Sequence, residues 1–171
     1  MFRYVLVYFF MCNTAISQEC SGDIQTKWVI NDPVQFQEFS QAIKCIGEFD
    51  VELNGSFLVD KTIQVSDGTV LNVTGAGTNG NTFIDGGKSV QIFSVVNSEL
   101  NLKDITLING NGTDGGAISA KSSKLSLVST RFVSNNGHNG GAMYISKKST
   151  VYCSGSSFTN NTASYGGGYV Y

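Results

Sequence analysis

The sequence predicts an all-β fold: a parallel β-helix (solenoid) of roughly four coils with one capping helix before them. The first observation is a Gly-Gly pair that recurs at a nearly constant step of about 25 residues, at Gly115-Gly116, Gly140-Gly141 and Gly166-Gly167. The second is a set of apolar positions that recur in the same register: Leu100, Leu125 and Val151; Leu102, Leu127 and Cys153; Leu107, Phe132 and Phe158. A unit of this length cannot bury a core alone, so it is stable only when stacked on its neighbours.

Composition agrees with one turn-rich β domain and argues against a nucleic-acid partner. The 171 residues are 41% hydrophobic and include 20 glycines and a single proline. A chain of this length can bury one core, whereas two independent domains are not expected. Charged residues make up 14% of the chain and the formal net charge is −2, so no basic surface is available for a phosphate backbone.

Residues 1–17 have the pattern of a secretory signal peptide. Arg3 precedes an apolar run over residues 4–11, and Ala15-Ile16-Ser17 supplies small residues for cleavage. The run is about half of the ~20 residues that a membrane-spanning helix needs. We therefore expect a mature chain that begins at Gln18, is secreted or displayed at the cell surface, and has no membrane span after cleavage.

Three cysteines remain in the mature chain: Cys20, Cys45 and Cys153. Cys20 and Cys45 flank one short N-terminal segment and are the predicted disulfide. Because Cys153 occupies the column of Leu102 and Leu127, we expect a small buried apolar residue there and neither a nucleophile nor a metal ligand.

Four N-x-S/T sequences permit glycosylation in a eukaryotic secretory pathway, at Asn54, Asn72, Asn111 and Asn160. The chain is rich in Asn, Ser and Thr, so this number is close to what chance gives. The four sites are candidates on the sequon alone.

Residues 18–56 lie before the repeat and contain the predicted helix. Asp32 is a suitable N-cap, Pro33 fits the first helical position and Gln35 completes a capping-box arrangement. The apolar residues up to about Cys45 then fall on one face: Phe36, Phe39, Ala42 and Ile43. We expect this helix to lie across the open end of the solenoid and to cover strand edges.

Residues 57–171 form the predicted coils, as short β-type runs separated by Gly and Asn. The spacing from Leu71 to Leu100 is slightly wider than the step of the later coils, which indicates a coil with a longer loop. The alternative takes the Asn-Gly pairs as hairpin turns of an antiparallel sandwich, but it does not explain a fixed step. Gly166-Gly167 opens a coil that stops at Tyr171, so this end is expected to need more chain or a partner.

Two stretches, FVSNNGHNGGAMYI (132–145) and FTNNTASYGGGYVY (158–171), resemble the FxxN and GGA(I/L) repeats of polymorphic outer-membrane proteins. The stretch VLNVTGAGTNGNTFIDGG (70–87) is similar to the first coils of the pectate-lyase-like superfamily. The resemblance covers about residues 30–171 and implies a right-handed parallel β-helix. It implies three kinds of inward column: an apolar ladder of Leu107, Phe132 and Phe158, a polar ladder of Asn135 and Asn161, and a column of Ile118, Met143 and Tyr169. The first of these coils departs from the pattern, because Gly110 stands where the next two coils have Asn.

Few residues suggest chemistry. His138 is the single histidine, and its equivalents one coil away are Thr113 and Ser164, so we expect an exposed turn residue and no general base. Asp85 and Asp114 both precede Gly-Gly, and their spacing equals that of Leu71 and Leu100, which suggests a vertical pair. Such a pair is the one candidate for catalytic acids or for calcium ligands, while each Asp alone favours a tight corner. No other cofactor or metal is expected.

These observations favour a secreted or cell-surface β-helix that is a non-catalytic adhesive, structural or carbohydrate-binding module. Its partners would be glycans or cell-surface proteins. A basic polar strip is a further candidate surface for acidic glycans: Lys121, Ser122, Ser123 and Lys124 on one coil, and Lys147, Lys148 and Ser149 on the next. Two alternatives stay open: a polysaccharide lyase, hydrolase or epimerase that uses Asp85 and Asp114, and an assembly subunit capped by a partner.

Overall fold

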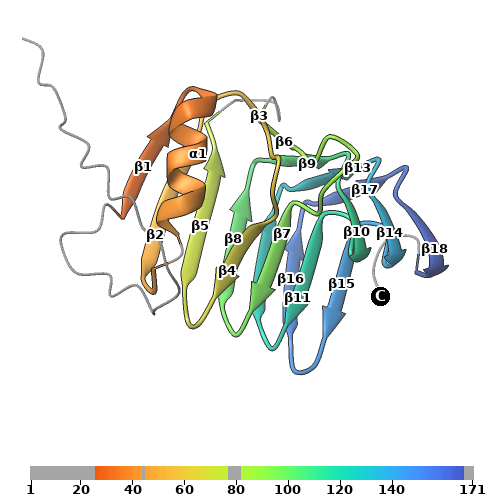
Figure 1. The fold of residues 1–171 in the computed structure, drawn as a ribbon. Helices are drawn as coiled ribbons and strands as arrows, with labels where there is room; N and C mark the ends of the chain where they lie inside the picture. Colours follow the sequence, from red (N-terminus) through yellow and green to blue (C-terminus); the bar gives the residue numbers. More distant parts are fainter. Residues whose placement is uncertain (1–25, 44, 77–81, 168–171) are drawn as a thin grey trace, which may run out of the picture.

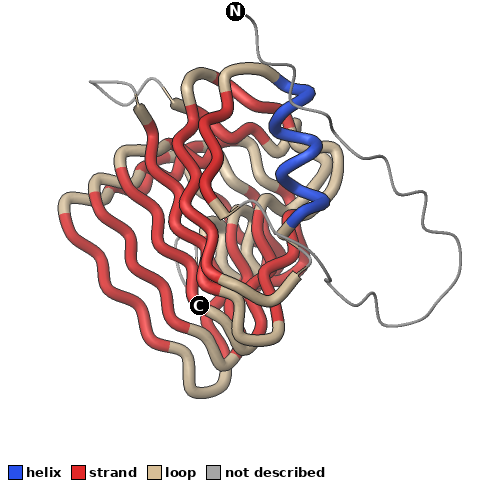
Figure 2. The backbone as a smooth tube through the Cα atoms, turned by 90° about the vertical axis from the view of Figure 1, so that its left-hand side faces the viewer, coloured by secondary structure: helices blue, strands red, loops and turns tan. Residues whose placement is uncertain are grey.

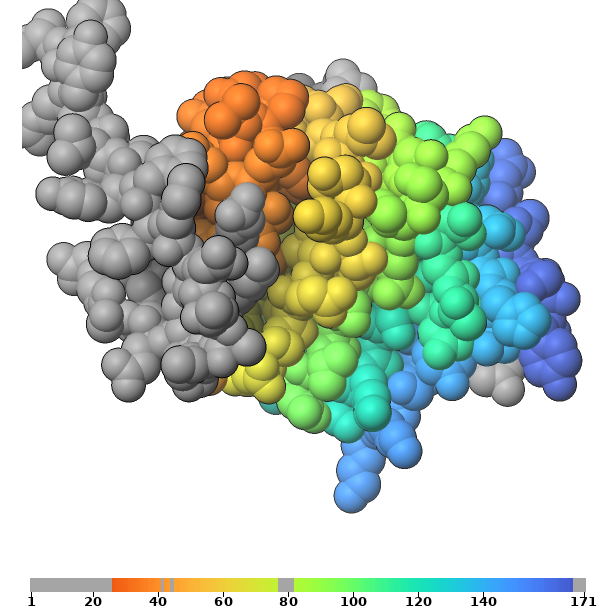
Figure 3. Space-filling view, viewed as in Figure 1, coloured from red at the N-terminus to blue at the C-terminus, as the bar shows by residue number. Residues whose placement is uncertain are grey.

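The computed structural model describes residues 26–43, 45–76 and 82–167 and shows a parallel β-solenoid of about five turns (Figure 1). The coils stack in chain order, and the space-filling view shows them as adjacent bands along the molecule (Figure 3). Every strand pair described is parallel, so the predicted β-helix is confirmed and the antiparallel sandwich is wrong.

The coils contribute strands to four sheets. The six-stranded sheet has the order β1-β2-β5-β8-β12-β16: Lys27–Ile30, Glu48–Leu53, Val70–Gly75, Glu99–Lys103, Lys124–Val128 and Thr150–Ser154. The five-stranded sheet has the order β17-β13-β9-β6-β3: Ser157–Thr159, Arg131–Val133, Thr106–Ile108, Phe83–Asp85 and Ser56–Leu58. The four-stranded sheet has the order β15-β11-β7-β4: Met143–Ser146, Ile118–Lys121, Phe93–Val96 and Ile63–Ser66. The three-stranded sheet has the order β10-β14-β18: Asn111–Asp114, Asn136–Asn139 and Thr162–Gly166.

The register of the six-stranded sheet explains the step seen in the sequence. Val70 pairs with Glu99, and Glu99 pairs in turn with Lys124, so the first interval is wider than the second, as predicted. Because neighbouring parallel strands lie ~4.8 Å apart, equivalent residues form columns along the solenoid axis. The three apolar columns predicted from the sequence are all present: Leu100, Leu125 and Val151; Leu102, Leu127 and Cys153; Leu107, Phe132 and Phe158.

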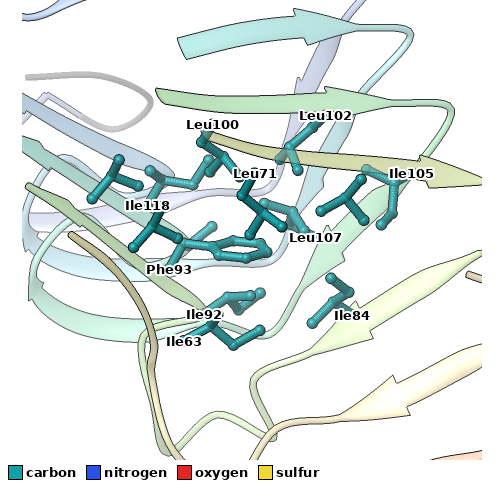
Figure 4. Packing of buried hydrophobic residues seen from close by; sticks show 14 of the residues in the cluster. Ile63, Leu71, Ile84, Ile92, Phe93, Leu100, Leu102, Ile105, Leu107 and Ile118 are labelled. Atoms are coloured by element: carbon teal, nitrogen blue, oxygen red, sulfur yellow. The ribbon is translucent and has the colours of Figure 1, made fainter. Parts of the chain in front are cut away.

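The core is the inside of the coils. Each strand alternates between inward and outward side chains, so β8 buries Leu100 and Leu102 and leaves Glu99 and Asn101 half-buried on the outside. Figure 4 shows how Leu71 and Leu100, from neighbouring coils, meet inside the stack. Each coil supplies only a thin layer of this core, so burial depends on the coils above and below.

Helix α1 (Pro33–Ala42) lies at the N-terminal end of the stack (Figure 1, Figure 2). Asp32 caps it as predicted: its carboxylate accepts hydrogen bonds from the backbone N–H groups of Val34 and Gln35, both at 2.9 Å. The Gln35 side chain accepts from the Asn31 N–H at 2.8 Å, one residue before the position that a capping box uses.

The apolar face of α1 closes the first coil. Phe36, Phe39 and Ile43 are at most 3% exposed. Phe36 stacks on Phe57 with ring centroids 4.9 Å apart, and Phe39 packs edge-on against Trp28 at 5.8 Å. The helix therefore covers the interior of the solenoid. The edge of the six-stranded sheet at this end is formed by β1 and not by the helix.

The coils begin before Phe57, the expected start. β2 pairs with β5 along its whole length, and β3 begins at Ser56, so the region assigned to the cap supplies a further coil. This coil accounts for the fifth turn. It is hard to find from the sequence because it has no Gly-Gly pair and its step, from Glu48 to Val70, is shorter than that of the later coils.

Two buried asparagines close the turn after the five-stranded sheet, as predicted. Asn135 is fully buried and Asn161 is 7% exposed. Asn135 Nδ2 donates to the Leu107 carbonyl at 3.1 Å, and Asn135 Oδ1 accepts from the Gly110 N–H at 2.8 Å. Gly110 replaces Asn in its coil because a Cβ there would lie 2.3 Å from the Gly116 carbonyl oxygen.

We expect Asn135→Ala to lower the free energy of unfolding by about 2 kcal/mol, because the Leu107 carbonyl and the Gly110 N–H would lose their buried partner. Urea denaturation followed by circular dichroism measures the loss. The control is Asn136→Ala, which removes an exposed amide at the next residue. Equal losses for the two variants would contradict the buried ladder.

The last described coil exposes side chains that were expected in the core. Cys153 pairs with Leu127 in the inward column, yet its side chain is exposed, and so the predicted burial is wrong. Among the described residues, β16 is the last strand of its sheet, and none of them adds a strand to that sheet beyond Cys153. What burial remains raises the pKa of its thiol above the ordinary value.

Some predictions fall outside the described residues. Cys45 is disulfide-bonded, but Cys20 is not among the residues described, so their pairing stays a prediction. The signal peptide and Tyr169 also lie outside the described residues. Ile118 and Met143, the other two members of the column predicted for Tyr169, are in register.

Candidate ligand groove

The three-stranded sheet carries two columns of polar side chains along the solenoid axis. Its register stacks Asn111, Asn136 and Thr162, and beside them Gly112, Gly137 and Ala163. The second polar column consists of Thr113, His138 and Ser164. Figure 1 shows the three strands, β10, β14 and β18, next to one another near the C-terminal end of the stack.

We call the hollow between these columns the axial groove. The part nearer the C-terminal end has a volume of about 360 Å³ and lies between Asn111 and Asn136 on one side and Thr113, His138 and Ser164 on the other. A second hollow of about 480 Å³ shares Asn111 and Thr113 with it and continues toward the preceding coils. The groove therefore crosses several coils.

Glycines between the two polar columns let the backbone pack closely against the corner that follows each strand. A Cβ on Gly112 would lie 2.5 Å from the Gly115 carbonyl oxygen, and one on Gly137 would lie 2.3 Å from that of Gly140. Gly115 and Gly140 themselves have φ values of +76° and +66°, which only glycine adopts readily. The Gly-Gly corners predicted from the sequence thus pack directly against the strands that carry the groove.

The amide column is tied together by side-chain hydrogen bonds. Asn136 Nδ2 donates to Asn111 Oδ1 at 3.2 Å, and the Thr162 hydroxyl donates to Asn136 Oδ1 at 2.9 Å. Asn111 Nδ2 donates to the Lys88 carbonyl at 3.1 Å. Because an amide has two N–H donors and two lone pairs, Asn136 keeps one of each for a ligand. Its orientation is already set.

A β-bulge shapes the other wall at its C-terminal end. Gly137 pairs with Ala163 but Asn139 pairs with Gly166, so Ser164 and Tyr165 together lie opposite His138. The Ser164 hydroxyl is 2.8 Å from His138 Nδ1, and the Tyr165 ring stacks on the imidazole with centroids 5.5 Å apart.

The same bulge corrects the predicted Gly-Gly register. The Gly140 N–H donates to the Gly166 carbonyl, and Gly167, which follows β18, has positive φ as Gly115 and Gly140 do. Gly167, not Gly166, is therefore the equivalent of Gly115 and Gly140. The extra residue in β18 shifts the third pair by one position.

His138 is exposed and lacks an acidic partner among the contacts described. Its ring contacts are Ser164 and Tyr165. The nearest acid along the groove, Asp114, accepts a hydrogen bond from Asn139 Nδ2 at 2.8 Å. Nothing among these contacts orients His138 as a general base. The residue is exposed, as expected, but it lies in strand β14 and not in a turn.

Asp85 and Asp114 do not form the predicted pair. Asp85 ends β6 and pairs with Ile108, whereas Asp114 ends β10 in another sheet and pairs with Asn139. Paired residues of β5 and β8 are as far apart in the sequence as Leu71 and Leu100. Paired residues of β6 and β9 are closer together in the sequence, as Asp85 and Ile108 are. The extra loop residues lie between β5 and β6, so the wide spacing no longer applies at Asp85.

The two acids instead have separate hydrogen-bond partners: Asp114 accepts from Asn139, and Asp85 accepts from Gly87 and Asn109. Asp85 Oδ1 accepts from the Gly87 N–H at 2.8 Å and from Asn109 Nδ2 at 3.1 Å, which is the corner role that Asp commonly has before glycine. Within the described ranges, no three His, Cys, Asp or Glu side chains gather in a metal-binding group. The separation of Asp85 from Asp114 removes the candidate acid pair and the candidate calcium site.

We expect millimolar calcium to leave the thermal midpoint of the protein unchanged. A site that bound calcium at 100 times its Kd would add about 2.7 kcal/mol, which a thermal melt detects readily. The measurement compares calcium chloride with magnesium chloride at equal ionic strength. A rise specific to calcium and lost in Asp114→Asn would contradict the expectation.

The basic strip is present in part. Four lysines are exposed: Lys121 at the end of β11, Lys124 at the start of β12, and Lys147 and Lys148 on the turn before β16. Ser123, however, is 3% exposed, and its hydroxyl donates to the Lys121 carbonyl at 2.8 Å. This serine closes the turn and is not available to a ligand.

The four sequon asparagines lie in different settings. The Nδ2 atoms of Asn54, Asn72 and Asn111 donate to Asn31, Asp50 and Lys88 at 2.9, 2.9 and 3.1 Å. Asn160 is exposed in a turn at φ +54°. Glycan occupancy at any of them stays a prediction.

Sequence reasoning missed the axial groove and Tyr165. A signal was available: Asn111-Gly112 and Asn136-Gly137 recur at the same step as the Gly-Gly pairs. These Asn-Gly pairs indicate turns when taken singly, and only the stacked register shows a continuous column. Nothing in the sequence indicated Tyr165, because the bulge that places its ring against His138 arises only when β18 pairs with β14.

No protein-family model, curated protein or solved structure matches this chain. In the part of the chain that the structure describes, no helix is long and apolar enough to cross a membrane.

Proposed function

We propose that this chain is a non-catalytic module that binds extended carbohydrate in the axial groove. The observation that carries the proposal is the pair of parallel amide and hydroxyl columns along the solenoid axis. Amides and hydroxyls are the groups that hydrogen-bond sugar hydroxyls. Since the coils repeat every ~4.8 Å, a linear chain meets a new set of groups on each coil. Weak contacts then add along the axis.

The separation of Asp85 from Asp114, the acids that the sequence suggested, favours a binding role over a catalytic one. Glycoside hydrolysis needs two carboxyl groups at a defined separation. Asp85 and Asp114 lie in different sheets, and His138 contacts a serine and a tyrosine. The proposal of a polysaccharide lyase, hydrolase or epimerase thereby loses the residues on which it rested.

Location and kinship belong to the same proposal. The signal-peptide pattern of residues 1–17 and the disulfide at Cys45 favour a secreted or cell-surface protein, because disulfides are typical of oxidising compartments. The FxxN and Gly-Gly repeats favour kinship with polymorphic outer-membrane and pectate-lyase-like β-helices. Within the parallel solenoid, Phe132 and Phe158 stack as that resemblance implies.

The test measures binding of the disulfide-bonded protein to a panel of soluble polysaccharides by affinity electrophoresis and calorimetry. Asn136→Ala removes an amide from the groove and is expected to weaken binding about tenfold, which corresponds to ~1.4 kcal/mol. The matched control is Asn101→Ala. The Asn101 amide donates to Asn72 at 2.8 Å on the six-stranded sheet, away from the groove. The affinity of this variant should stay within about twofold of that of the parent protein.

Three outcomes would contradict the proposal. One is that no polysaccharide binds. Another is that Asn136→Ala and Asn101→Ala have the same effect, which would place binding elsewhere. The third is release of reducing ends or unsaturated products from a bound polymer, which would make the protein an enzyme.

One observation favours a second candidate, an assembly subunit. Val151 is 37% exposed and Cys153 is exposed although both belong to inward columns. Association through this coil would bury them. Sedimentation of the protein tests this: a monomer at all concentrations would contradict self-assembly.

A further inference from the structure

The groups that line the axial groove carry little charge. Its two hollows are lined mostly by amide, hydroxyl and glycine residues, with Val90, His138 and one acid, Asp114; Lys and Arg are absent from this lining. The Asp114 carboxylate is engaged by Asn139. A uronate or sulfate group in the groove would lose water without meeting a cation, which is costly. Uncharged hydroxyls would find donors and acceptors in both columns.

An exposed aromatic side chain, Tyr165, lies against His138, one of the residues that line the groove. Tyr165 is 79% exposed, the most exposed large hydrophobic residue described. Its ring lies nearly parallel to that of His138, with an interplanar angle of 18°. The Ser164 contact to Nδ1 and the bulge hold both rings in place. Such a flat apolar surface gains free energy when the C–H face of a sugar ring covers it.

We propose that the axial groove selects an uncharged polysaccharide and that Tyr165 stacks on one of its sugar rings. This inference rests on the proposed function and adds the class of ligand and the residue that anchors it. The amide column then positions the following sugars by hydrogen bonds. Because Asn111, Asn136 and Thr162 are already bonded to one another, few side-chain rotamers need to be frozen on binding.

The basic strip provides the competing surface. Lys147 and Lys148 are exposed on the turn before β16, outside the residues that line the groove. A sulfated or uronic polymer held by these lysines would bind less tightly as salt rises, because exposed charges are screened. Binding in the axial groove should be nearly independent of salt. Salt dependence therefore distinguishes the two surfaces.

The experiment uses the full disulfide-bonded chain with two sets of probes. The uncharged set is soluble xylan, a mixed-linkage β-glucan and chitin oligosaccharides, and the acidic set is polygalacturonate, alginate and heparin. Each is titrated at low and high sodium chloride. We expect binding to at least one uncharged probe, little change with salt, and weaker or no binding to the acidic set.

Variants at two tyrosines of the last described coil identify the anchor. Tyr165→Ala should weaken binding to the uncharged probe at least tenfold, and Tyr165→Phe, which keeps the ring, should stay within about threefold of the parent. The matched control is Tyr152→Ala, which removes a ring that is 63% exposed on the six-stranded sheet. It should leave affinity unchanged. Thermal melts confirm that these surface variants are folded.

Failure of the inference and failure of the proposed function give different results. If acidic polymers bind best and Asn136→Ala weakens them, the groove binds carbohydrate but the ligand class is wrong. If uncharged probes bind but Tyr165→Ala matches Tyr152→Ala, the anchor is wrong. If neither set binds, or if binding is lost only in Lys147→Glu with Lys148→Glu, the proposed function and this inference both fail.

Discussion

Replacing Phe132 by alanine is expected to lower the free energy of unfolding by about 3–5 kcal/mol. Phe132 is fully buried at the centre of the apolar ladder, in register with Leu107 on one side and Phe158 on the other. Its ring lies 4.7 Å from that of Phe158, centroid to centroid, with an interplanar angle of 7°. Loss of the ring opens a cavity between two coils, and backbone hydrogen bonds between the strands prevent the coils from closing it. Urea denaturation with a fitted m-value measures the change.

Two control variants make the Phe132 prediction specific. Phe132→Leu places the side chain of the preceding coil at this position and should cost less than about 1.5 kcal/mol. Phe158→Ala removes a ring that is only half-buried in the last described coil and should cost less than Phe132→Ala. A loss below about 1 kcal/mol for Phe132→Ala would contradict a continuous inward ladder.

Replacing Gly115 by alanine is expected to cost more than about 3 kcal/mol, or to prevent folding. Two effects add at this corner. The φ of +76° is unfavourable for any residue with a Cβ, and the added Cβ would lie 2.0 Å from the Ile118 carbonyl oxygen and 2.8 Å from the Tyr144 nitrogen. These are backbone atoms held in neighbouring strands, so the overlap cannot be relieved by a side-chain rotation.

Gly68→Ala separates the two effects at Gly115. Gly68 has a φ of +86°, but a Cβ there would have no atom within 4 Å. This variant should therefore cost only the left-handed conformation, about 1–2 kcal/mol. Soluble yield and urea midpoints of both variants give the comparison even if one of them is poorly folded. Equal effects would mean that the Gly-Gly corner tolerates a side chain.

The features that depend only on the repeat step could be predicted from the sequence. The ladder of Leu107, Phe132 and Phe158 and the buried Asn135 and Asn161 occur as expected, because a nearly constant step leaves one possible register. The helix after Asp32 was also predictable, since capping and apolar spacing are local signals.

Features that depend on where residues are inserted could not be predicted. Asp85 and Asp114 separate because the extra loop residues lie between β5 and β6, a location that the spacing of Leu71 and Leu100 does not reveal. Gly166 is displaced from the corner by one extra residue in β18. In both cases the total step stays compatible with stacking while part of the coil moves out of register.

By itself, the sequence determined the parallel coils, their inward columns and the glycine corners. These follow from periodicity, which places like residues over one another in any stacked arrangement. The tertiary structure decided the rest: the first coil at β2, the exposure of Cys153 and the pairing of His138 with Tyr165 across a bulge. The physical reason is that the burial and direction of a side chain depend on the neighbouring coil. The residues of one coil do not by themselves determine which residues of that neighbour they will contact.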